Sequence, residues 1–452
     1  MSQISLSRMI KFGIFLLCIS AVAVIPAERG TLRAGAAKID ITPAADASLR
    51  MYGYSNRTEG FKGIHDDMSV RAIVFDDGTT QSAIVTAEVG SFSNDLWEKY
   101  TKRIAETAKI PVDNVMLAAV HAHAVPTVGS MGGGPRRQGD AAQARAKAKP
   151  QPPRDPQQEA RQAAYGQKVE DAVVEAVRQA KANLQPAKIG FGTGKANVNT
   201  NRRARNGEGG WMLGNNPEGP SDKTVAVIKL ETMSGEPFAI FSNYGCHATI
   251  LGPANLLVSS DLAGATARYV EKHYAGKVIS PWTSGTAGDQ DPIYRVGTDF
   301  HNVAGLGEIL GMEVVRVADT IKTTPYGHIR QGLQKVVTCP GKRTIQPTAP
   351  GQPYTFEDAD PVSIRLSLLV INDIAITGVS GEVLTNIGLR LKREAPFNRT
   401  IMITHCNGSS GYLADDAAYD QVSYEIISTR AKRGCAEDSI VNGLLDLMGG
   451  YF

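Results

Sequence analysis

The sequence has few cysteines, no large excess of charge and no internal repeat, and each shortage excludes a class of protein. It holds five cysteines in 452 residues and no C-x-x-C pair, which excludes a thiolate metal knuckle. The formal net charge is +3 with acids and bases interspersed, so there is no basic stripe of the kind that binds nucleic acid. Without a repeat, a solenoid or propeller is not expected.

Long apolar runs are also scarce, and the run Phe12–Ala27, preceded by Lys11, is too short and too weakly flanked to span a bilayer. It predicts a secretory signal peptide over residues 1–27. Leu17 before Cys18 is not the small residue that a lipoprotein signal requires. We therefore expect a secreted or periplasmic protein with no stable membrane insertion, in which disulfides are permitted among the four remaining cysteines. Their pairing cannot be read from spacing.

Residues 28–452 alternate β-rich and helical segments, which predicts an α/β fold of layered mixed β-sheets flanked by helices in one catalytic domain. A hairpin is expected at 69–87, around the turn Asp76-Asp77-Gly78. Helices are predicted at 94–109, 159–182 and 425–448, and further strands at 115–120, 188–191, 224–230, 238–243, 363–370 and 374–379.

Two segments are predicted to be loops. Residues 129–158 are rich in Gly, Pro, Ala, Gln and Arg and cannot bury enough apolar surface to form a core, which indicates a disordered insertion. Its place after His123 also allows a lid over a site. Residues 339–352, rich in Pro and Thr, are expected to form a second loop.

Three potential metal ligands follow three predicted strands. His121-Ala122-His123 comes after 115–120, His247 after 238–243, and Glu382 after 374–379. Residues two apart on a strand face one side, so both histidines of the first motif can point into one cleft. Strand ends converge in α/β folds, and two histidines with a carboxylate suit zinc with a position left open for water. Taken alone, each motif is also typical of ordinary polar residues at a strand end.

The order and spacing of these motifs resemble the neutral (non-lysosomal) ceramidase family, from about Ala34 to Thr429. The matching segments are 37–43, Gly63-Ile64-His65-Asp66-Asp67, the His121 motif, Asn201-Arg202, the His247 motif, Ser259-Ser260-Asp261, Gly288-Asp289-Gln290-Asp291-Pro292, Gly381-Glu382 and the stretch from Tyr412 to Tyr424-Glu425.

The resemblance implies a Zn²⁺ ion held by four residues: His121, His247, Glu382 and Tyr412. Tyr412 is preferred to Tyr419 because it has the family's spacing from Cys406-Asn407 and from Tyr424. His123, Arg202 and Tyr424 match substrate-cradling positions. By resemblance, a zinc-activated water attacks an amide carbonyl, Tyr424 helps to stabilise the oxyanion, and His123 moves a proton. The substrate is expected to be a small-molecule amide, with an N-acyl lipid as one candidate.

The chain departs from the family pattern at Asp291, which stands where ceramidases carry a functional serine in G-D-V-S-P. A serine-based step is therefore excluded at this position. An ionised Asp291 is expected to be paired, either with Arg202 or with a cationic group of the substrate. This charge, and the lack of a counterpart to the family's C-terminal immunoglobulin-like domain, lead us to predict poor activity on ceramide.

Other readings remain open from the sequence. The same site suits an ester or lactone hydrolase, and a family member that binds a ligand without turnover is a third possibility. Asp261, Asp289 and Asp291 fit either a second cation site or ordinary turns. Cys246 and Cys406 are expected to be buried small hydrophobes, and His405 has no supporting motif and is expected to be a surface or core residue.

Overall fold

The protein was analysed as a computed structural model, which describes residues 30–54, 56–129, 155–347 and 352–451. The predicted signal peptide and most of the predicted insertion lie outside these residues. In the described part, no helix combines the length and apolar character needed to cross a bilayer.

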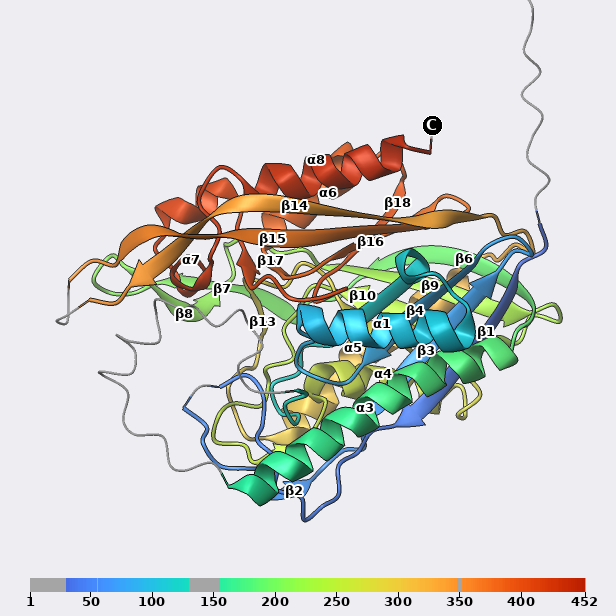
Figure 1. Cartoon of the computed structure of the whole chain (residues 1–452), viewed down its shortest axis with the longest axis horizontal. Coiled ribbons are helices and arrows are strands. Elements are labelled where there is room, and N and C mark those ends of the chain that lie inside the picture. Colours follow the sequence, from blue (N-terminus) through green and yellow to red (C-terminus); the bar gives the residue numbers. More distant parts are fainter. Residues whose placement is uncertain (1–29, 55, 130–154, 348–351, 452) are drawn as a thin grey trace, which may run out of the picture.

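Four layers make up the fold, in the order helices, sheet, sheet, helices (Figure 1). The larger sheet is mixed, with the strand order β12-β10-β9-β6-β1-β3-β4-β5. The smaller sheet has the order β14-β15-β16-β18. Helices α1, α3, α4 and α5 cover the free face of the larger sheet, and α6 and α8 cover the free face of the smaller one. The predicted fold class is confirmed.

The bounds of the larger sheet and its helices are β1 Arg33–Asp40, β3 Ser69–Asp76, β4 Gln81–Ala87, β5 Val115–Ala119, β6 Gln185–Lys195, β9 Thr224–Thr232, β10 Pro237–Tyr244, β12 Trp282–Ser284, α1 Asn94–Ala108, α3 Pro156–Ala182, α4 Asp261–His273 and α5 Phe300–Thr320. The second half contains β14 Ile329–Ile345, β15 Thr355–Ile371, β16 Ile374–Val379, β18 Arg399–Ile403, α6 Thr385–Glu394, α7 Tyr424–Ser428 and α8 Ala436–Gly449. Small sheets join β2 Gly63–Ile64 to β11 Leu257–Val258, β7 Asn199–Arg205 to β8 Trp211–Asn216 and β13 Gln290–Pro292, and β17 Glu382–Val383 to β19 Tyr412–Leu413.

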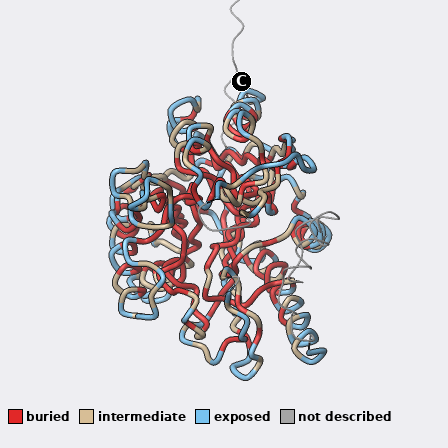
Figure 2. Tube along the Cα trace, turned by 90° about the vertical axis from the view of Figure 1, so that its left-hand side faces the viewer, coloured by how far each residue is buried: buried red, intermediate tan, exposed pale blue. Residues whose placement is uncertain are grey.

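The alternation of side chains explains why the larger sheet is buried on both faces. In β3, Val70, Ala72 and Val74 pack under the helices, whereas Ile73 and Phe75 pack against the second sheet. A strand that faces apolar layers on both sides reads as a continuous apolar run, because its residues alternate between the two faces. The red, buried trace therefore passes through the centre of the molecule in Figure 2.

Three sequence predictions differ from the structure. Helix α3 begins at Pro156, capped by the Asp155 carboxylate, so the end of the predicted 129–158 loop is helical. The predicted loop at 339–352 is strand up to Ile345, and Pro340 is tolerated there because the register shifts between Cys339 and Gly341.

The third difference is the predicted helix 425–448, which is broken into α7 and α8. Between them, the Arg430 carbonyl accepts a hydrogen bond from Lys342 N, and Gly434 takes a left-handed φ of 85°. Cys435, next in the chain, forms a disulfide with Cys339 of β14. Pairing with β14 therefore replaces helical hydrogen bonds in this segment. Cys246 and Cys406 are buried and free, as expected.

Candidate metal centre

The site lies where the chain leaves β5, β10 and β16, at one end of the sheets. His121 follows β5 with a left-handed φ of 60°, a conformation that is uncommon for a residue with a side chain. The spacing of the two histidines predicted that they share one face of a strand. They do not, because the strand ends before His121 and the chain turns there. They converge because the chain turns at His121, and backbone strain of this kind clusters at functional sites.

Two of the histidines have a fixed tautomer. The Nδ1 atom of His121 lies 2.8 Å from the Gly90 carbonyl oxygen, and that of His247 lies 2.7 Å from the Ala287 carbonyl oxygen. A carbonyl oxygen can only accept, so both Nδ1 atoms carry the proton and both Nε2 atoms keep a lone pair. Such backbone acceptors are typical of metal-binding histidines.

The lone pairs meet around one point. Glu382 Oε2 lies 3.5 Å from His121 Nε2 and 3.3 Å from His247 Nε2, and His123 Nε2 lies 3.3 Å from His121 Nε2. Two ligand atoms bound to one tetrahedral zinc at about 2.1 Å lie roughly 3.4 Å apart. The rings of His121 and His247 are inclined to one another by 66°, as expected for rings that converge on one ion, and His123 borders the same space. The cluster fits a metal.

His405 also lies in this cluster, which corrects the expectation that it has no part in a site. Its nitrogen lies within 4.8 Å of ligand atoms of His121 and Glu382, but its ring stacks on His121 at 3.7 Å between centroids and 13° between planes. The nitrogen lone pairs of two stacked rings lie in parallel planes and do not point at one common position. His405 therefore supports His121 rather than sharing its ion.

Tyr412 is the neighbour of Glu382 in register, because β17 and β19 pair in parallel with Glu382 opposite Tyr412. Its hydroxyl accepts a hydrogen bond of 2.8 Å from Arg202 Nη2, which leaves the oxygen able to face an ion. The Tyr419 hydroxyl instead donates to the Ala431 carbonyl oxygen at 2.8 Å. The register thus places Tyr412, and not Tyr419, beside the Glu382 carboxylate.

Arg202 is buried and its N–H groups all point at protein atoms. Besides Tyr412, it donates to Glu425 Oε1 at 2.7 Å, Asp291 Oδ1 at 3.1 Å and the Gly288 carbonyl oxygen at 2.8 Å, and its remaining N–H lies 3.5 Å from His247 Nε2. The resemblance implied that Arg202 cradles the substrate. The geometry instead commits four of its five N–H groups to Glu425, Asp291, Gly288 and Tyr412 and makes it the centre of a buried network.

Asp291 has two cationic partners. Its Oδ1 atom pairs with Arg202, and its Oδ2 atom pairs with Arg295 Nη1 at 2.7 Å. Burial opposes ionisation, but Arg202, His247 and Arg295 outweigh it and keep the pKa of Asp291 below its usual value. Of the two partners that the sequence allowed, Arg202 is observed, and Arg295 is a partner that sequence reasoning missed.

The open side of the site is formed by three residues that are partly exposed. His123 has a buried Nδ1 atom with no hydrogen-bond partner among the described residues. Tyr424, at the start of α7, is 44% exposed and lies edge-on to Tyr412 at 5.7 Å between centroids. Tyr52, which no motif indicated, lies edge-on at 5.6 Å from both His121 and His123. A substrate would approach from this side.

The charges around the cluster are set by burial and by close partners. Burial disfavours the ionised carboxylate of Glu382, but the adjacent His121 and His247 hold its pKa well below the usual range. Burial lowers the pKa of His123, and His121 and His247 lower it further. The pKa shifts thus favour a neutral imidazole at His123 and an ionised carboxylate at Glu382, and these are forms that can bind a metal.

The other acidic candidates are occupied by protein donors. Asp261 accepts from the backbone N–H groups of Ile250, Leu251 and Leu262. Asp289 pairs with Arg203 at 3.2 Å and accepts from Thr385 at 2.7 Å. Both carboxylates therefore have a structural role. Their contacts favour the interpretation as ordinary turn residues and not the second cation site.

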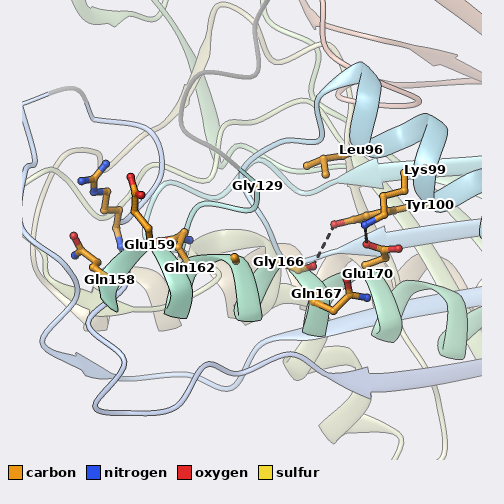
Figure 3. A pocket seen from close by; sticks show the side chains of 12 residues that line it. Leu96, Lys99, Tyr100, Gly129, Gln158, Glu159, Gln162, Gly166, Gln167 and Glu170 are labelled. Carbon is orange, nitrogen blue, oxygen red and sulfur yellow. Dashed lines mark hydrogen bonds and ion pairs between the residues drawn. The ribbon is translucent and has the colours of Figure 1, made fainter. Parts of the chain in front are cut away.

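A cavity of about 390 Å³ lies between α1 and α3 and is separate from this cluster (Figure 3). It is bordered by the ion pair of Lys99 with Glu170 and by the Tyr100 hydroxyl, which lies 3.4 Å from the Gly166 carbonyl oxygen. None of the predicted site residues lines it.

Comparison with known proteins agrees with the motifs. The sequence profile described as "Neutral/alkaline non-lysosomal ceramidase, N-terminal" matches residues 158–295. Neutral ceramidase A of Dictyostelium discoideum is 28% identical over 54% of this chain and 32% of its own length. Neutral ceramidase of Pseudomonas aeruginosa is 26% identical over 64% of this chain and 41% of its own length.

Solved structures give the same result for the fold. A "Ceramidase complexed with C2" aligns with a TM-score of 0.73 at 17% identity, covering 93% of this chain and 76% of that one. The crystal structure of the Pseudomonas aeruginosa neutral ceramidase gives a TM-score of 0.70 at 18% identity, with 93% and 75% covered. The family resemblance is confirmed, at the distance of a divergent relative. The matched part spans about a third of the first of these sequence relatives.

Proposed function

We propose that this protein is a zinc-dependent hydrolase that cleaves an amide bond. The observation that carries the proposal is the convergence of His121 Nε2, His247 Nε2 and Glu382 Oε2, with both Nδ1 atoms tied to backbone carbonyls. The relatives named neutral ceramidase support the reaction class, because ceramide is an N-acyl amide.

Zinc would be held by His121, His247, Glu382 and Tyr412. The donor set supports this choice of metal. It combines imidazole nitrogens with carboxylate and phenolic oxygens, which is typical of zinc sites, whereas calcium and magnesium prefer sites made of oxygen atoms alone. A bound zinc ion would polarise the substrate carbonyl and would lower the pKa of its bound water to near neutral pH. Arg202 positions the Tyr412 oxygen through its 2.8 Å hydrogen bond.

Two residues on the open side would act on the substrate. His123 is placed to take and return a proton, because its Nε2 faces the cluster while no described residue holds its Nδ1. The Tyr424 hydroxyl, carried on an exposed ring at the start of α7, would donate to the oxygen that becomes negative when the carbonyl is attacked. Asp291 is locked between two arginines, so it would act through Arg202 and not on the substrate.

We further propose that the protein is exported. The apolar segment Phe12–Ala27 supports a signal peptide. The disulfide between Cys339 and Cys435 supports an oxidising compartment, because such bonds are rare in reducing cytosol.

The proposal is tested by metal analysis combined with hydrolysis assays. The purified protein is expected to hold about one zinc per chain and to hydrolyse N-acyl amides, assayed beside the matching esters. His121→Ala, His247→Ala and Glu382→Ala should each lose zinc and activity, whereas Tyr412→Phe should keep more zinc and still lose rate. His273→Ala, at the end of α4, is the control. Stoichiometric zinc in all three alanine variants, or no turnover of any amide by the zinc-loaded protein, would reject the function.

A further inference from the structure

The network around Asp291 extends from His247, in the candidate metal cluster, to the partly exposed Arg295. Arg202 Nη1 lies 3.5 Å from His247 Nε2 and 3.1 Å from Asp291 Oδ1. Asp291 Oδ2 in turn accepts from Arg295 Nη1 at 2.7 Å. Arg295 is thus three contacts from a metal-facing nitrogen, and its side chain is 24% exposed where those of Arg202 and Asp291 are 5% and 2% exposed.

The backbone holds Arg295 rigidly in this position. Val296 has a left-handed φ of 59°, which is strained for a β-branched residue. Its N–H donates to the Thr249 carbonyl oxygen at 3.0 Å, and the Gly297 N–H donates to the Ile250 carbonyl oxygen at 2.8 Å. The loop is therefore pinned to the segment that follows His247. A strained conformation that the surrounding structure maintains is common where a side chain must be presented to a ligand.

Arg295 keeps donors that the described residues do not use. Its one observed partner is Asp291, which occupies Nη1. A guanidinium carries five N–H donors, and two of them can grip a carboxylate side by side. Asp291 cannot serve a cationic substrate, since both of its oxygens already face arginines.

A second guanidinium adds to the positive potential. Arg57 lies over the Tyr54 ring at 5.2 Å, and that ring lies 5.1 Å from His123. Arg57 donates to the backbone carbonyls of Tyr52, His123 and Asn255, and no carboxylate pairs with it among the described residues. The carboxylate of Asp261 is already taken by three backbone donors. Arg57 is therefore a guanidinium on the His123 side of the site that no described carboxylate neutralises by direct pairing.

We propose that Arg295 binds a carboxylate on the amine portion of the substrate, so that this hydrolase prefers N-acyl amino acids to neutral or cationic amides. The inference rests on the proposed amide hydrolase function. It replaces the expectation that Asp291 would select a substrate amine.

The test compares binding of N-octanoylglycine and of its neutral counterpart N-octanoylglycinamide by calorimetry, with zinc-loaded and with metal-stripped protein. Wild type is expected to bind the acid roughly tenfold or more tightly than the amide in both forms, since a hydrogen-bonded charge pair is worth about one decade or more. Arg295→Gln should abolish this preference while changing the affinity for the neutral ligand less than about twofold. Arg295→Lys, which keeps the charge but not the paired donors, should retain part of it.

Controls separate the outcomes. Arg399→Gln removes a distant surface arginine that pairs with Asp373 and should behave as wild type. Zinc content and the urea unfolding midpoint establish that each variant is folded. A full preference in Arg295→Gln, a preference seen only with zinc bound, or no preference in wild type would overturn the inference. If the acid binds through Arg295 but neither compound is hydrolysed, the proposed function fails and the anion site stands.

Discussion

Replacing Asp291 with serine, the residue that ceramidases carry there, should destabilise the protein. Asp291 and Arg202 have side chains only 2% and 5% exposed, and Glu425 is fully buried, so the group of two arginines and two carboxylates is balanced in charge. Asp291→Ser leaves two guanidinium groups with one carboxylate. An uncompensated buried charge costs about 3–5 kcal/mol. Because Arg295 is 24% exposed and can turn toward water, we expect the lower end, about 3 kcal/mol.

Urea unfolding of wild type, Asp291→Ser, Arg295→Gln and the double variant measures this cost and the coupling between the two residues. The double variant restores the charge balance, so its loss should be smaller than the sum of the single losses by at least about 1 kcal/mol. Asp373→Ser is the matched control, since this aspartate pairs with Arg399 at 3.0 Å with both side chains about half exposed. It should cost less than about 1 kcal/mol.

A loss below about 0.5 kcal/mol in Asp291→Ser, or no coupling with Arg295, would refute the charge-balance argument. Ceramide hydrolysis by the same variants gives a second readout. Serine alone should not raise activity on ceramide, because Arg295 remains, whereas the double variant removes the charge that we propose selects an acidic substrate.

Three further predictions concern other parts of the molecule. Tyr52→Leu should weaken zinc binding by roughly 10–100-fold in chelator competition, because the ring supports both His121 and His123, while Tyr52→Phe should stay near wild type; equal affinities would contradict this role. Removing the disulfide by Cys339→Ser with Cys435→Ser should lower the free energy of unfolding by about 2–4 kcal/mol, and thiol titration of the unfolded, unreduced wild type that finds both cysteines free would show that the bond does not form. Burial raises the pKa of Asp261 from 3.8 to about 6. The contribution of this shift to the free energy of unfolding is therefore complete below pH 3.8 and is lost as the pH rises through 6. Asp261→Asn should lack this loss in urea unfolding measured between pH 4 and pH 7, and an unchanged pH profile would count against the shift.

Local patterns predicted some of the elements, whereas helices α4 and α5 and strands β1 and β14 were not predicted. The hairpin of β3 and β4, helix α1 and strand β16 lie within a residue or two of their predicted bounds, since alternation and turn residues act over a few neighbours. The helix predicted at 425–448 failed because a long-range contact with β14 and the disulfide of Cys435 compete with local helical hydrogen bonds. Similarly, Pro340 was taken as a loop signal, whereas a register shift accommodates it in a strand.

The sequence by itself determined the α/β class, the relation to the ceramidases and which histidines and carboxylates are available as ligands, because residue type, spacing and motif order are written along the chain. Only the tertiary structure decided how they meet. The left-handed turn at His121, the stacking of His405 on it and the locking of Asp291 between Arg202 and Arg295 join residues from remote segments. The free energy of a buried ligand or charge depends on which groups the fold brings within a few ångströms of it, and no local pattern specifies that.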